Sequence, residues 1–177
     1  MKKFVLTVYL LQVLVAQKYI TRNGSVSFFS ETPIEDIRAL NKQTSCVLDI
    51  NTGSFAFQVP IRGFMFKNAL MQEHFNENYM ESHDFPKATF RGGIENWLDF
   101  KLSKQSQDIS VKGALTIHGV SKKIRVSGTI RQDRDQIKGV AFFDIFPSDY
   151  NIKIPRVVRD KIAKTIQISV NVKLEEK

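Results

Sequence analysis

Three histidines and a single cysteine are the residues of this 177-residue chain best suited to metal or nucleophile chemistry. The histidines are His74, His83 and His118, and no two of them have the i, i+4 spacing that zinc ligands on one helix share. Cys46 cannot form a disulfide within the chain, because it has no partner. It lies in the apolar stretch 45–50, which favours a small buried hydrophobic residue. We therefore expect no metal site.

The acids are scattered, and the chain contains no constellation that could catalyse a reaction. Glu73 and Glu77 stand four residues apart, and on a helix this pair favours a solvated face over an acid/base couple. No glycine-rich phosphate loop occurs, and neither does a Gly-x-Ser-x-Gly nucleophile elbow. The sequence therefore predicts that the protein is not an enzyme.

Asp149 and Tyr150 allow two interpretations. In the first, Tyr150 lines the mouth of a pocket and Asp149 polarises its hydroxyl. In the second, Asp149 bonds to backbone N–H groups in a turn and Tyr150 is a packed, half-buried aromatic residue. We favour the second, because turn chemistry of this kind needs no ligand.

The first sixteen residues have the layout of a cleavable export signal. Lys2 and Lys3 precede the apolar run 4–15, and Ala16 offers a small residue before Gln17. The run is short for a bilayer span. A mitochondrial-type presequence and a buried first strand are the alternatives. We expect a signal peptide at 1–16 and a mature domain at 17–177, with a net charge of +6 after the loss of two lysines from +8.

The basic excess lies in two clusters of the mature chain. An anionic membrane surface or anionic head groups could be attracted to them, whereas the simpler alternative is the solvated surface of a basic protein. Nucleic acid is not expected, because the chain has an export signal and no recognition module. The cluster residues are Lys122, Lys123, Arg125, Lys153, Arg156, Arg159, Lys161 and Lys164.

Apolar and polar residues alternate with a period of two over most of the chain after residue 24. One clear example is the run 109–117, in which Leu115 and Ile117 share a face and Lys112 lies on the other. Such alternation is typical of half-buried antiparallel strands. Turn residues separate the runs at 51–53, Gly92-Gly93, 118–119 and 133–136. The pattern indicates an all-β sandwich or barrel.

Two segments break this period. Residues 68–80 predict a helix with Asn68 as its N-cap and apolar residues at near-helical spacing. Residues 155–164 predict a shorter helix in which Val158 and Ile162 stand four apart among basic residues. No linker, repeat or low-complexity tract occurs, so the mature chain is expected to form one domain.

One closed sheet can turn all of these apolar faces inward. We predict a single antiparallel β-barrel of about eight strands, with the helix at 68–80 closing one end. A barrel of this size is either filled by side chains or hollow enough for one small ligand, and the pattern does not distinguish the two. The sequence also leaves open whether the protein is a monomer or a homodimer.

Three segments, in order and at matching spacing, resemble the YceI-like family. They are His74-Phe75-Asn76-Glu77-Asn78-Tyr79-Met80-Glu81-Ser82 followed by Phe85-Pro86-Lys87-Ala88-Thr89-Phe90, then Gly113-Ala114-Leu115-Thr116-Ile117-His118-Gly119-Val120-Ser121-Lys122, and finally Ser148-Asp149-Tyr150-Asn151-Ile152. The resemblance extends over about residues 18–175. The segment 31–41 departs from the family pattern, because it is more polar and longer than a simple hairpin, and it could alter one barrel mouth.

The resemblance implies a lipocalin-like barrel that is exported to the bacterial periplasm. It also implies a ligand, since relatives enclose a polyisoprenoid or an isoprenoid quinone, but no catalytic residue and no further cofactor. His74, as a rim residue, could then contact a quinone head group. The alternative function is a filled-barrel protein of an envelope stress response or a membrane-protein complex.

A lipid tail requires an apolar tunnel, and the inward-facing residues of the strands and helix provide one. Because the resemblance favours a hollow interior, we expect these residues to bind the isoprenoid. The candidates are Phe57, Val59, Phe64, Phe75, Tyr79, Phe90, Leu115, Ile117, Phe143, Ile145, Ile168 and Val170.

Overall fold

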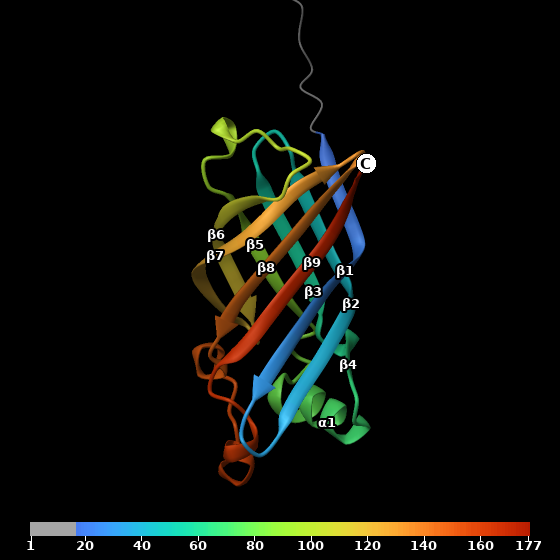
Figure 1. The fold of residues 1–177 in the computed structure, drawn as a ribbon. Helices are drawn as coiled ribbons and strands as arrows, with labels where there is room; N and C mark the ends of the chain where they lie inside the picture. Colours follow the sequence, from blue (N-terminus) through green and yellow to red (C-terminus); the bar gives the residue numbers. More distant parts are fainter. Residues whose placement is uncertain (1–16) are drawn as a thin grey trace, which may run out of the picture.

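The computed structural model describes residues 17–177, and the expected export signal at 1–16 lies outside the described residues. Most of the described chain is β-structure, with one α-helix and several short helical segments (Figure 1). The strands are β1 (Lys18–Glu31), β2 (Asp36–Asp49), β3 (Ser54–Pro60), β4 (Phe64–Phe66), β5 (Lys87–Ile94), β6 (Gln107–Ile117), β7 (Val120–Asp133), β8 (Gln136–Ile145) and β9 (Ile166–Glu176). The helical segments are η1 (Ile61–Gly63), α1 (Ala69–His74), η2 (Phe75–Tyr79), η3 (Trp97–Asp99), η4 (Pro147–Tyr150) and η5 (Arg156–Lys161).

Eight of these strands close into one antiparallel barrel. Their order is β1-β9-β8-β7-β6-β5-β3-β2, and the pairing of β1 with β2 completes the ring. The short strand β4 pairs with β2 beyond the end of β3. Closure removes the unpaired edges that an open sheet would expose. The structure confirms the predicted all-β, lipocalin-like barrel of about eight strands and adds β4.

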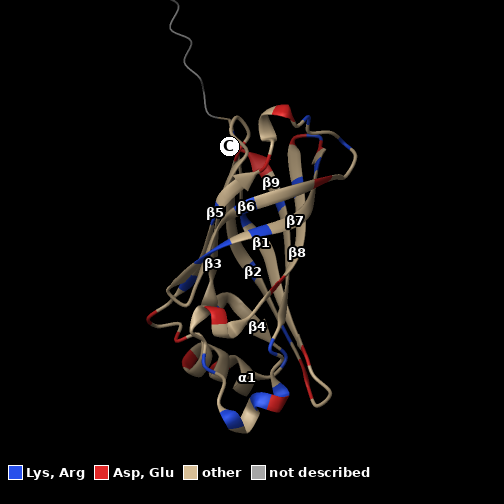
Figure 2. Ribbon diagram, turned by 90° about the vertical axis from the view of Figure 1, so that its left-hand side faces the viewer, with Lys and Arg blue, Asp and Glu red and all other residues tan. Residues whose placement is uncertain are grey.

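The barrel has two different ends. α1, η2 and η5 lie at the lower end, whereas both termini of the described chain lie at the upper end (Figures 1 and 2). The backbone carbonyl of Gln17 accepts a hydrogen bond from the Ile50 amide at the upper end. The first residue of the expected mature chain is thus tied to the barrel.

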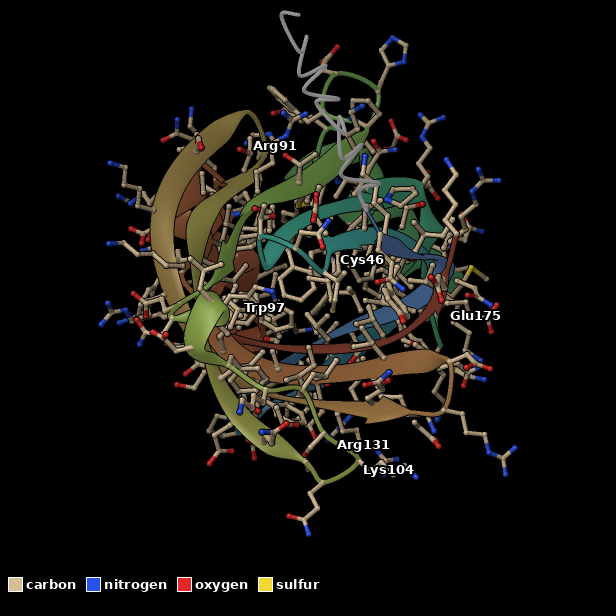
Figure 3. All side chains as sticks on the ribbon, turned by 90° about the horizontal axis from the view of Figure 1, so that it is seen from above. Cys46, Arg91, Trp97, Lys104, Arg131 and Glu175 are labelled. Atoms are coloured by element: carbon tan, nitrogen blue, oxygen red, sulfur yellow. The ribbon has the colours of Figure 1, made fainter. Side chains whose placement is uncertain are left out.

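The upper end is packed with side chains. Leu48, Ile130, Ile137 and Leu174 are almost fully buried there. Trp97 joins them, and its indole Nε1 donates to the Ile50 carbonyl at 2.6 Å. Viewed from above in Figure 3, Cys46 and Trp97 lie within the ring of strands, and Lys104, Arg131 and Glu175 lie outside it.

The turn predicted at Gly92-Gly93 is wrong, because both glycines lie within β5. Gly92 faces Gly113 of β6 across the sheet. A Cβ at Gly113 would lie 2.6 Å from Cζ of Phe90, and one at Gly92 would lie 2.8 Å from the same atom. The glycines are therefore needed because the Phe90 ring covers them.

The structure defines three other segments more closely. The segment 31–41, which departs from the family pattern, is the end of the β1–β2 hairpin: both strands continue through it and only residues 32–35 form the turn. The helix expected at 68–80 divides into α1 and the π-helical turn η2. The segment expected as a helix at 155–164 contains only the 3-10 turn η5, at its centre.

Candidate ligand cavity

A cavity of about 510 Å³ occupies the lower part of the barrel, towards α1 and η5. Its wall consists of the inward faces of the strands, which are almost entirely aliphatic or aromatic. The cavity extends from the mouth up to Ile130 and Val172, which belong to the packed core of the upper end. The volume lies within the range of sites that hold small organic molecules.

All twelve residues predicted for the pocket line this cavity. Nine come from strands of the barrel, Phe64 comes from β4, and Phe75 and Tyr79 come from η2. Leu115 and Ile117 face inward, as the alternation required, whereas Lys112 of the same strand is exposed. The structure thus places the predicted set around one space. Their contact with a ligand stays a prediction.

The helix at the mouth is held by its cap and by an aromatic cluster. The Asn68 side chain accepts hydrogen bonds from the backbone amides of Leu70 and Met71, as expected of an N-cap. Phe75 of η2 lies 5.0–5.6 Å, centroid to centroid, from three rings of the barrel mouth. These rings belong to Phe28, Phe64 and Phe66.

η2 has π-helical geometry, which often marks functional positions in helices. The wide turn directs both Phe75 and Tyr79 into the cavity. Burial raises the pKa of the Tyr79 phenol above its ordinary value, so the side chain stays neutral at physiological pH. A neutral phenol is compatible with an apolar ligand.

A segment that the pocket prediction missed closes the other side of the mouth. We call residues 151–165, between η4 and β9, the mouth loop. Its apolar side chains line the cavity, and Val158 and Ile162 are among them. The backbone amide of Ala163 donates to the Ser30 hydroxyl at 2.9 Å, which ties the loop to β1. Only the spacing of Val158 and Ile162 could have signalled this position.

The charged groups of the cavity lie at its mouth. Among the described residues that line it, Glu35 and Lys161 carry full charges, and they come from the β1–β2 hairpin and the mouth loop. His74 of α1 also lines the cavity, at the rim where it was expected. The site can therefore take an apolar chain inside and leave a polar group at the entrance.

Tyr150 does not line the cavity but packs in the barrel wall, where only 2% of it is exposed. Burial, and to a lesser degree the nearby Asp149 carboxylate, raises the pKa of its phenol. Asp149 pairs with Lys122 at 3.0 Å. The favoured interpretation is correct for Tyr150, although this residue is fully rather than half buried, whereas the Asp149 carboxylate makes its ion pair with Lys122 and no bond from a backbone amide among residues 17–177.

His118 occupies the β6–β7 turn, as predicted, with a left-handed backbone at φ 48°. Its role extends beyond the turn, because its ring packs against that of Phe85 at a tilt of 58° and bonds to two other segments. Nε2 lies 2.7 Å from Glu81 after η2, and Nδ1 lies 3.1 Å from the Tyr150 carbonyl. The histidine thus joins the β6–β7 turn to the segment after η2 and to η4.

Residues 17–177 contain neither a metal-binding cluster nor a membrane-spanning helix. No group of three or more His, Cys, Asp or Glu side chains is arranged to hold a metal ion. No helix in this range has the length and apolarity required to cross a membrane.

Similar folds occur among solved structures. A polyisoprenoid-binding domain from Saccharophagus degradans has a TM-score of 0.78 at 13% identity, and the match covers 90% of this chain and 98% of that one. BcnA of Burkholderia cenocepacia has a TM-score of 0.71 at 18% identity over 85% and 95% of the two chains. The YCEI protein of Campylobacter jejuni has a TM-score of 0.59 at 18% identity over 100% and 99%. At these identities the likeness shows the fold alone.

No curated protein gives a significant sequence match. The family model of the YceI-like domain, in contrast, matches residues 19–174, which include the complete cavity wall and all nine strands except the first residue of β1 and the last two of β9. The chain belongs to the YceI-like family.

Proposed function

We propose that this protein binds one long isoprenoid lipid, either a polyisoprenoid or an isoprenoid quinone, inside its barrel and stores or carries it outside the cytoplasm. The observation that carries the proposal is the apolar cavity of about 510 Å³, with its charged groups confined to the mouth. The polyisoprenoid-binding domain of the same fold supports this ligand class.

The chemistry of the cavity wall indicates which kind of molecule can fill it. Water is a poor occupant, because the wall offers few polar partners. An apolar chain fits better, since each buried CH₂ contributes about 0.8 kcal/mol before ordering costs.

Binding rather than catalysis is the function that these residues support. The groups at the mouth, Glu35, His74 and Lys161, come from separate elements, and no hydrogen bond or ion pair joins them among the described residues. A filled-barrel interaction protein is the weaker alternative, because it does not account for the cavity.

The proposal is tested by extracting the protein purified from its native host with organic solvent and identifying the extract by mass spectrometry. An isoprenoid in near-stoichiometric amount is the expected result. Leu115→Lys and Phe143→Lys place an ammonium in the tunnel. They should yield folded protein without lipid, because the lysine stem can lie along a hollow wall and its head can reach entering water.

The matched control is Lys112→Leu on the outer face of β6, which should keep both fold and lipid. In a filled core the two lysine variants would bury an unpaired charge and unfold the domain. Unfolded lysine variants, together with a wild-type extract that contains no lipid, would show that the carrier proposal is wrong.

A further inference from the structure

The mouth loop concentrates positive charge at one side of the cavity entrance. Residues 151–165 contain five cations and one acid, Asp160, so the loop carries a net charge of +4. All five cations are exposed. They are Lys153, Arg156, Arg159, Lys161 and Lys164.

This charge is not neutralised within the described part of the molecule. None of the five cations takes part in the ion pairs found in residues 17–177. The other basic cluster differs, because Lys122 pairs with Asp149 and Arg125 pairs with Glu95. The cations of the mouth loop are therefore available to an external anionic partner.

The same loop presents an apolar tip to solvent. Val157, the second residue of η5, is 90% exposed and lies between Arg156 and the cavity-lining Val158. Leu70 of α1, at the same end of the barrel, is 58% exposed and also lines the cavity. The loop thus has one side that faces the cavity, an apolar tip at Val157 and exposed cations on both sides of that tip.

The charge at the mouth is one-sided. The turn end of the β1–β2 hairpin, residues 31–36, carries Glu31, Glu35 and Asp36 and contains no Lys or Arg. An anionic surface would attract the mouth loop and repel the hairpin. This difference in charge would orient the barrel with the mouth loop towards the surface and the β1–β2 hairpin away from it.

We propose that the mouth loop docks the barrel onto an anionic lipid bilayer, with Val157 in the interface and the surrounding cations among the lipid phosphates. Interfacial membrane contacts combine these two features, an apolar tip and basic residues. A protein partner would need a broad complementary face, whereas this segment is a short projecting loop (Figure 1). The inference rests on the proposed function, because a lipid that enters at this mouth leaves a membrane.

The test is flotation of the purified protein with vesicles of phosphatidylcholine alone and of phosphatidylcholine mixed with phosphatidylglycerol. We expect binding to the mixed vesicles only, and weakening with added salt. Reversing two charges with Arg156→Glu and Arg159→Glu should reduce binding about tenfold or more. Val157→Ser should also reduce binding, and its exposure makes a folding defect unexpected.

The matched control is the pair Lys101→Glu and Lys104→Glu, which changes the net charge equally at the upper end. It should retain vesicle binding. Equal loss in both double variants would overturn the inference, since the attraction would then depend on net charge alone. Absence of wild-type binding to the mixed vesicles would overturn it too.

The lipid content of the same samples separates this inference from the proposed function. Loop variants that keep their extracted lipid but lose vesicle binding support docking. A wild-type protein that carries isoprenoid but ignores anionic vesicles refutes docking and leaves the carrier function standing. Vesicle binding that requires the loop, without any lipid in the extract, refutes the carrier function and leaves docking.

Discussion

The imidazole Nε2 of His118 lies 2.7 Å from a carboxylate oxygen of Glu81, although 37 residues separate the two in sequence. The other ring nitrogen faces the carbonyl oxygen of Tyr150 at 3.1 Å. Both partners are acceptors, so the imidazolium form donates to both and a neutral ring donates to one. Glu81 follows η2 directly, which makes this pair the link between the helical cap and the barrel wall.

Glu81→Ala should loosen the cap, because it removes this acceptor. We expect a loss of about 1 kcal/mol in the free energy of unfolding, since the carboxylate is largely solvated, and faster hydrogen exchange in α1 and η2. Glu77→Ala is the matched control, because Glu77 is an exposed residue of η2, four positions before Glu81, and makes no ion pair within the described chain. Equal exchange rates in the two variants would contradict a specific role for Glu81.

Alternation along the strands was enough to predict the wall of the cavity. Whether Leu115 or Lys112 faces inward depends on a local period of two, and one correct residue fixes the face of all others on that strand. For the same reason the candidates on β3, β8 and β9 were predicted together. The same alternation does not show how far the side chains fill the interior. It therefore predicts which residues face inward but not whether a cavity lies between them.

Features that depend on partners far away in sequence were not predictable in this way. Gly92 seemed to be a turn residue, because its role in β5 is set by Gly113 and by the Phe90 ring above both. The pairing of His118 with Glu81 and the position of the mouth loop against Ser30 have the same origin. Each requires knowledge of which strands are neighbours.

Gly113→Ala should destabilise the barrel. Its added Cβ would clash with the Arg91 carbonyl oxygen. This atom belongs to the backbone, so the clash can be relieved only if a strand shifts. We expect a loss of about 1–3 kcal/mol, measured by denaturant unfolding. Gly139→Ala is the control: Gly139 lines the cavity, and its added Cβ would meet a side-chain methyl of Val172 at 3.3 Å, so this variant should be nearly neutral.

Cys46 should not react with thiol reagents in the folded protein. It is fully buried in the packed upper end, as the sequence predicted, and burial raises the pKa of its thiol. The reactive thiolate is therefore scarce and inaccessible at neutral pH. An aromatic disulfide reagent should label it only in denaturant, at a rate that follows unfolding. Rapid labelling under native conditions would mean that the upper end opens.

Export should remove residues 1–16. Lys2, Lys3 and the apolar run up to Val15 motivate this expectation, and Gln17 begins the part of the chain that joins the barrel. N-terminal sequencing of the protein from its native host should start at or near Gln17, and fractionation should find it outside the cytoplasm. An intact Met1 on most of the protein would refute this prediction.

Enlarging a side chain should have opposite effects at the two ends of the barrel. Ala141 of β8 lines the hollow part, so the ring of Ala141→Phe can occupy space that the ligand otherwise fills. This variant should keep its stability but lose extracted lipid. Cys46→Phe makes a similar change in the packed end and should cost about 1–3 kcal/mol through overpacking.

Thermal unfolding and lipid extraction of both variants measure this difference. A loss of stability in Ala141→Phe equal to that in Cys46→Phe would mean that both ends are packed alike, and the cavity could not then hold a lipid. Retention of full lipid content by a stable Ala141→Phe would place the ligand elsewhere in the lower barrel. Only a stable variant without lipid agrees with an isoprenoid chain that passes Ala141 on its way from the mouth.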